Sequence, residues 1–172
     1  MKKYIPKEMI AKSRFKDYYA KWSSEEQKRL LEIMERLIRE NSEYADNKNY
    51  GHMCNLITSL AMETALEEMG KARSEAQDAV AQAMYSFIQP RIAPMQKLAG
   101  NSWFVGILKL TMPIKYSHTV GYGWDVEYPK CGSGVYSMVI HKCIYQQIFS
   151  KYGMPEMTAI FCKVDDIMYS DL

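Results

Sequence analysis

Apolar positions in the first two-thirds of the chain recur every three or four residues, which is the spacing of one face of an α-helix. The clearest pattern spans residues 24–40 and is preceded by Ser23. Ser23 and Glu26 together are typical of a capping box, in which each side chain binds the backbone N–H of the other residue. A second helix is predicted over residues 52–69, with Gly70 as the residue that ends it.

Three further helices are predicted in this part of the chain from weaker patterns. Residues 6–20 form the first of them. The second begins with a cap at Ser74 and ends at Pro90, because proline cannot donate the helical hydrogen bond. The third lies within residues 94–112 and is closed by Pro113. Its apolar stretch is too short to span a bilayer, although contact with a membrane surface is an alternative interpretation.

The pattern changes after Pro113, where a stretch rich in tyrosine and glycine leads to residues 124–128. Those residues alternate between apolar and polar types, as a half-buried strand does. Residues 135–140 are rich in β-branched and aromatic types, so the two segments predict a hairpin with a long loop. A helix over residues 143–152 should follow.

Gly153 is expected to end that helix, and Pro155 to open a last short helix that runs to Phe161. The order of elements predicts an α+β protein, with N-terminal helices packed with a small antiparallel sheet and C-terminal helices. We expect a single domain over residues 1–172. Its helical part covers about residues 6–112, and its hairpin and C-terminal helices cover about residues 115–172.

Composition and missing motifs argue against several classes of function. The 172 residues carry a net charge of +2, and they show no basic surface pattern, so no nucleic-acid partner is expected. No apolar run has the length of a membrane span, and the N-terminal lysines are not followed by an apolar stretch. We therefore expect a cytoplasmic protein with no membrane partner, and a homo-oligomer remains possible. Motifs for dinucleotides, for P-loops, for zinc proteases and for α/β-hydrolases are all missing from the sequence.

Reactive side chains concentrate near the C-terminus. His141 and Cys143 stand at a predicted strand-to-helix junction, with Lys142 between them. A cysteine that opens a helix is biased towards the thiolate, which is its nucleophilic form. Cys162 and Asp165 follow directly after the predicted last helix. The alternatives are that the thiols are packed in the core, or that these residues bind a metal; their spacing fits no zinc motif, and no metal is expected.

The same region carries an ordered series of motifs. It resembles the L-2-amino-thiazoline-4-carboxylic acid hydrolase family, whose members carry a basic residue–Cys–x–Tyr motif, a Gly-x-Pro-Glu-Leu-like turn and a Phe-Cys-x-x-Asp motif. The helix from His52 to Gly70 is also similar to the middle helix of the family. The matching segments are Lys142-Cys143-Ile144-Tyr145, Tyr152-Gly153-Met154-Pro155-Glu156-Met157, and Phe161-Cys162 with Asp165.

The resemblance implies a hydrolase, active without a cofactor, that opens the ring of L-2-amino-Δ2-thiazoline-4-carboxylate to a carbamoyl-cysteine on the way to L-cysteine. Many members have arginine where this chain has Lys142, and leucine where it has Met157, which leaves the substrate open. The predicted catalytic residues are Cys143, His141 and Asp165, and the predicted substrate-binding residues are Lys142, Tyr145, Cys162 and His52.

Two other classes of function compete with this one. Small α+β domains often hold a small molecule without transforming it, so a non-catalytic binding or sensor domain is the main alternative. A helical interaction protein would instead use the helices over residues 24–40 and 52–69 as a docking face.

Overall fold

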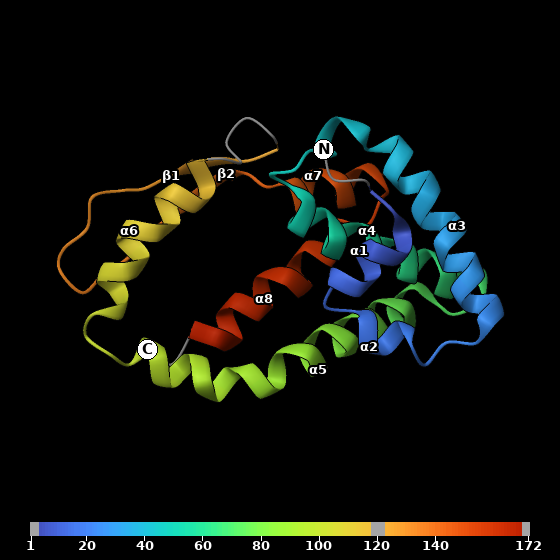
Figure 1. Cartoon of the computed structure of the whole chain (residues 1–172), viewed down its shortest axis with the longest axis horizontal. Helices are drawn as coiled ribbons and strands as arrows, with labels where there is room; N and C mark the ends of the chain where they lie inside the picture. Colours follow the sequence, from blue (N-terminus) through green and yellow to red (C-terminus); the bar gives the residue numbers. More distant parts are fainter. Residues whose placement is uncertain (1–3, 118–122, 170–172) are drawn as a thin grey trace. The chain divides into compact units, whose positions relative to one another are not determined.

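The chain folds into helices and one small antiparallel sheet, which confirms the predicted α+β class (Figure 1). The computed structural model describes residues 4–117 and 123–169. No helix within those ranges combines the length and the hydropathy that a membrane span requires. In chain order the elements are α1 (Pro6–Lys12), α2 (Lys16–Tyr19), α3 (Ser24–Glu40), the 3-10 turn η1 (Ser42–Tyr44), α4 (Tyr50–Glu68), α5 (Arg73–Ala99), α6 (Phe104–Ser117), β1 (Asp125–Glu127), β2 (Val139–Lys142), α7 (Ile144–Lys151) and α8 (Met157–Tyr169).

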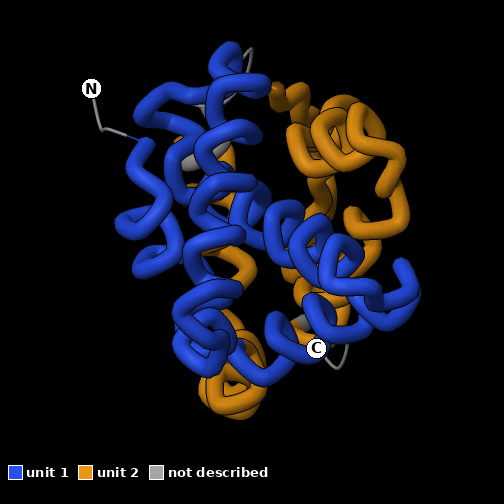
Figure 2. Tube along the Cα trace, turned by 90° about the vertical axis from the view of Figure 1, so that its right-hand side faces the viewer, with its two compact units in different colours: residues 1–87 blue, residues 88–172 orange. Residues whose placement is uncertain are grey.

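The backbone divides into two compact units, residues 1–87 and residues 88–172 (Figure 2). The boundary falls inside α5, so a continuous helix and not a loop joins the two units. The sequence accordingly has no linker there. The expectation of a single domain stays a prediction.

The capping box at the start of α3 is confirmed. The backbone N–H of Glu26 donates to Ser23 Oγ at 3.3 Å, and the backbone N–H of Ser23 donates to Glu26 Oε2 at 2.6 Å. The predicted end of α4 is also confirmed, because Gly70 follows the helix with φ +88°. This left-handed conformation costs glycine little, since it has no Cβ.

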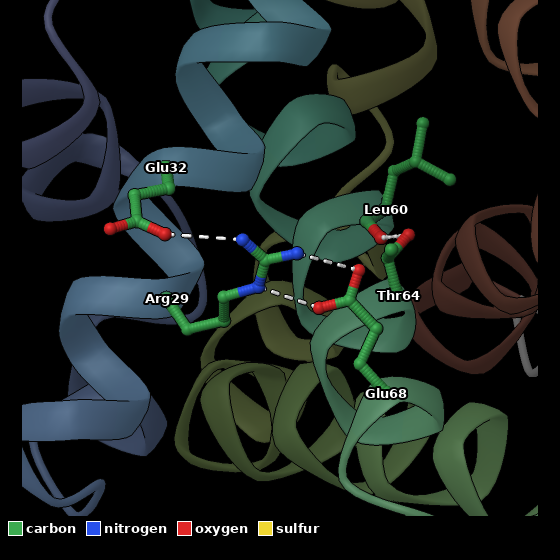
Figure 3. Close-up of polar contacts among 5 residues, drawn as sticks. All are labelled: Arg29, Glu32, Leu60, Thr64 and Glu68. Carbon is green, nitrogen blue, oxygen red and sulfur yellow. Dashed lines mark hydrogen bonds and ion pairs between the residues drawn. The ribbon is translucent and has the colours of Figure 1, made fainter.

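Helices α3 and α4 are joined across their surface by a two-pronged ion pair (Figure 3). Arg29 on α3 donates through Nε to Glu68 Oε2 at 2.7 Å and through a terminal nitrogen to Glu68 Oε1 at 3.0 Å. Arg29 also pairs with Glu32 at 3.1 Å on its own helix. Beneath this surface most residues of α4 are buried, and the helix contacts both α1 and α3.

The prediction of one helix over residues 6–20 is wrong, because Ser13 separates α1 from α2. Its hydroxyl oxygen accepts the N–H of Phe15 at 3.1 Å, and the N–H of Arg14 donates to Asn55 Oδ1 at 2.9 Å. Side chains thus take two donors that a continuous helix would need for its own carbonyls.

The prediction that a helix ends at Pro90 is wrong as well. Helix α5 passes through Pro90 and Pro94 and continues to Ala99. Each proline leaves the carbonyl four residues earlier, at Ser86 and Pro90, without its helical donor. Ser86 and both prolines are exposed, so water can hydrate these carbonyls and the helix need not stop.

The start of α5 and the break after it also differ from the sequence prediction. Helix α5 begins at Arg73, and Glu75 binds back to the N–H of Ala72 at 3.3 Å, where a cap at Ser74 was expected. The region predicted as one helix over residues 94–112 is divided between the end of α5 and the start of α6. Asn101 donates its side-chain amide to two carbonyls near the end of α5 at 2.9 Å, and α6 then runs through Pro113.

The predicted hairpin is confirmed, with shifted boundaries. Strands β1 and β2 pair antiparallel with Val126 opposite Ile140 and Asp125 opposite Lys142. Between these two pairs, β2 has one residue more than β1. His141 is therefore the extra residue of a β-bulge. Residues 118–122, within the stretch rich in tyrosine and glycine, lie outside the described residues.

Helix α7 ends where the sequence predicted, at a Schellman turn around Gly153, which has φ +70°. The N–H of Met154 donates to the carbonyl of Phe149 at 2.9 Å, and the N–H of Gly153 donates to the carbonyl of Ser150 at 3.0 Å. Met154 is buried and anchors the reversal. The last helix is longer than predicted, because α8 continues past Phe161 to Tyr169.

Aromatic rings hold α7 against α8. The ring centroid of Tyr145 lies 4.5 Å from that of Phe161 and 6.3 Å from that of Trp124. Phe149 is fully buried, with its ring centroid 5.7 Å from Phe161. These four residues form the aromatic cluster of the second unit.

We expect Phe149→Ala to lower the free energy of unfolding by about 3–5 kcal/mol, because it removes a buried ring and leaves a cavity. Leu110→Ala is the control: its side chain is 69% exposed, so a change within about 0.5 kcal/mol is expected. Urea unfolding of both variants measures the difference. Equal losses in the two variants would show that the aromatic cluster does not stabilise the fold.

We also expect an acid-dependent contribution from Glu68. Hydrogen bonding to Arg29 lowers the pKa of this carboxyl from its usual 4.5. A lowered folded pKa stabilises the protein above the unfolded value and loses that contribution as the pH falls through the folded pKa. The destabilisation by Glu68→Gln should therefore be present at neutral pH and vanish in acid. Glu35→Gln, an exposed neighbour on α3, should show no such change.

Candidate active site

Cys143 occupies the N-cap of α7, as the sequence predicted. Its backbone is extended, with φ −127° and ψ 123°, and its carbonyl accepts the first helical hydrogen bond from the N–H of Gln147 at 3.0 Å. Its side chain makes no capping hydrogen bond, and the residue is half-buried. The first amides of a helix have no acceptor within the helix, so Cys143 stands beside backbone donors that can hydrogen-bond a polar group of a ligand.

Cys162 lies on α8 close enough to Cys143 for the two thiols to influence each other. Partial burial of the sulfur raises the pKa of Cys162, and negative charge on Cys143 and on Asp165 raises it further. Cys162 therefore keeps its proton more firmly than an ordinary cysteine does. The structure thus brings together one thiol at a helix start and one thiol that favours the protonated form.

Asp165 follows Cys162 by three residues, so both lie on one face of α8. The negative charge of this carboxylate contributes to the raised pKa of Cys162, so Asp165 lies close to that thiol. Asp166, the neighbouring carboxylate, forms an ion pair with Lys163 on the exposed surface. Of the two aspartates, Asp165 is therefore the one that accompanies the thiols.

His141 is held by a contact that the sequence did not indicate. Its ring nitrogen Nε2 lies 3.1 Å from Glu127 Oε2 on the paired strand, and both side chains are about half exposed or more. The bulge of β2 at His141 sets the direction of this side chain. Within the described parts of the chain, no hydrogen bond joins His141 to Cys143.

The three remaining predicted residues lie in different surroundings. Lys142 is exposed at the end of β2, directly before Cys143. Tyr145 is buried in the aromatic cluster, where its ring packs against Phe161. His52 is half-buried in the first turn of α4, in the first unit, whereas the thiols belong to the second. The structure therefore groups Cys143, Cys162 and Asp165 and leaves the substrate-binding roles as predictions.

All four cysteines are free thiols, and Cys54 alone is fully buried, as a packed core residue would be. No group of three or more histidine, cysteine or acidic residues in residues 4–117 and 123–169 is arranged to hold a metal ion.

The second unit also contains a solvent-open cavity of about 400 Å³ that the sequence did not predict. It lies between α6 and the long β1–β2 loop, and its lining includes Lys109, Tyr128 and Cys131. None of Cys143, Cys162 and Asp165 lines it. Helical periodicity places Lys109 on α6, but no sequence signal pairs it with a loop more than twenty residues away.

The fold and these residues define a small α+β protein with a thiol-based candidate site. The model of the L-2-amino-thiazoline-4-carboxylic acid hydrolase family matches residues 52–172 of the chain. The chain therefore belongs to this family, and the matched region contains every site residue predicted above. No curated protein and no solved structure showed a significant match to the chain.

Reactivity of Cys162 tests the geometry of the thiols directly. Negative charge on Cys143 raises the pKa of Cys162, so Cys143→Ser should lower that pKa and speed the modification of Cys162 by iodoacetamide. Asp165→Asn should act in the same direction. The rate is followed by peptide mass spectrometry from neutral to alkaline pH.

Cys131→Ser is the matched control, because Cys131 is also a half-buried free thiol of the second unit. It should leave the reactivity of Cys162 unchanged. If Cys143→Ser and Cys131→Ser have the same effect, the two thiols on α7 and α8 do not form one site.

Proposed function

We propose that the protein is a hydrolase that opens the ring of L-2-amino-Δ2-thiazoline-4-carboxylate, or of a close analogue, to give a carbamoyl-cysteine. The observation that carries the proposal is the grouping of Cys143, Cys162 and Asp165 in a member of this family. The three residues supply the groups that ring opening needs: a nucleophile, a proton donor and a base.

Cys143 acts first in the proposed mechanism. Its thiolate forms a bond to the ring carbon between sulfur and nitrogen, and the bond from that carbon to the ring sulfur breaks. The departing sulfur takes the proton of Cys162, whose raised pKa keeps that proton available. The substrate is then an open chain attached to Cys143 through its former ring carbon.

Water completes the reaction by adding to the same carbon. One proton of the water ends on the former ring nitrogen and the other on Asp165. The bond to Cys143 breaks, which frees the thiolate and releases N-carbamoyl-cysteine. The proton on Asp165 returns to Cys162, so one water is consumed and the enzyme is restored. Removal of the carbamoyl group in a later hydrolysis would yield L-cysteine.

The other predicted residues take supporting roles in the proposal. Lys142 offers a point charge to the substrate carboxylate, which is a weaker contact than the two-pronged one of arginine. His141, oriented by Glu127, is a second candidate for acid–base work. Tyr145 and His52 remain predicted substrate-binding residues, and the cytoplasm remains the expected compartment.

A non-catalytic small-molecule binding protein is the second candidate function. It is favoured by one observation: the cavity of the second unit is lined by other residues than the thiol site. In that case the thiazoline would bind without being consumed.

The proposed activity is tested by incubating the protein with the thiazoline and measuring carbamoyl-cysteine by mass spectrometry. Cys143→Ala should abolish the product, because the nucleophile is lost, whereas Cys131→Ala should retain it. Asp165→Asn should slow turnover by roughly 100-fold, as expected for loss of a general base.

Thermal melting controls for folding in every variant, and two outcomes would contradict the proposal. Full turnover by folded Cys143→Ala would make that thiol a packing residue. Full turnover by both Asp165→Asn and His141→Ala would leave no support for either base. A wild-type protein that is stabilised by the thiazoline but releases no product would support the binding protein.

A further inference from the structure

The cavity between α6 and the β1–β2 loop is open to solvent and has the volume of a small-molecule site. Its volume of about 400 Å³ lies within the range of ligand pockets. Pro113 from α6 and Pro129 and Tyr136 from the loop give it flat, apolar walls. Such walls suit a planar ring better than a branched aliphatic group.

The charged groups of the cavity are all positive. Lys109 and Lys130 contribute to the lining, and no aspartate or glutamate does. Lys109 is fixed in place, because its ammonium donates to the carbonyls of Gly132 at 2.6 Å and Cys131 at 3.3 Å. Carbonyl oxygens orient this ammonium without neutralising it, and a third N–H remains for a ligand. A charge held in position before binding loses little entropy when an anion arrives.

The hydroxyl group of Tyr128 gives the cavity an oriented hydrogen-bonding group. Tyr128 donates its hydroxyl hydrogen to the carbonyl of Met112 at 3.3 Å, so its oxygen is turned towards accepting a hydrogen bond. Burial raises the pKa of Tyr128, which keeps the hydroxyl neutral beside the lysines. The cavity thus offers two cations, one neutral acceptor and planar apolar walls.

We infer that this cavity binds a small organic carboxylate with a planar ring, held through Lys109 and Lys130 at a site separate from Cys143. The carboxylate meets the two ammonium groups, and the ring lies against the proline and tyrosine walls. The site would operate whether or not the thiols are catalytic, because none of them lines the cavity.

Benzoate is the probe, and benzamide is the neutral control of the same shape. Titration of the ¹⁵N-labelled protein should give saturable benzoate shifts at the amides of Lys109, Lys130 and Cys131, with much weaker shifts for benzamide. Lys130→Gln should raise the Kd for benzoate about threefold, the effect of losing one exposed ion pair. Lys151→Gln, an exposed lysine on α7, should leave the affinity unchanged.

Lys130 is exposed, so its substitution leaves the contacts of Lys109 with the loop intact. Equal binding of benzoate and benzamide, shifts centred on Cys143, or no saturable shift at millimolar benzoate would each overturn the inference. Cys143→Ala should bind benzoate as the wild type does. The result is therefore independent of whether the protein opens the thiazoline ring.

Discussion

The left-handed backbone at Gly153 is the constraint on which the thiol site depends. It ends α7 in a Schellman turn and sends the chain back, so that α8 packs along α7. Cys143 lies at the start of the first helix and Cys162 within the second. Without the reversal, nineteen residues of helix would separate these thiols by about 28 Å, at 1.5 Å per residue.

The aromatic cluster then fixes how the two helices meet. Tyr145 and Phe149 on α7 pack against Phe161 on α8, and the residue after Phe161 is Cys162. The family motif therefore contains two kinds of residue. Its tyrosine, glycine and phenylalanine build the scaffold, whereas its cysteines and Asp165 are the residues proposed to react. This explains why a motif with few chemically reactive residues extends over more than twenty positions.

Local signals in the sequence predicted the elements well where one short segment decided the outcome. The capping box of Ser23 and the glycines that end α4 and α7 are such cases, since they act through backbone groups a few residues away. Prediction failed at Ser13 and Pro90. A partner on another helix, Asn55, takes a donor beside Ser13, and exposure to water lets α5 continue through Pro90.

For the candidate site, the sequence alone determined that Cys143 opens a helix, because a helix start depends on neighbouring residues. The family motif was also visible in the sequence. Only the tertiary structure decided that Asp165 and not Asp166 accompanies the thiols, and that His141 pairs with Glu127. The cavity beside Lys109 was likewise found only in the tertiary structure. Burial and charge at a site depend on residues distant in the chain, and their positions are set by packing rather than by local propensity.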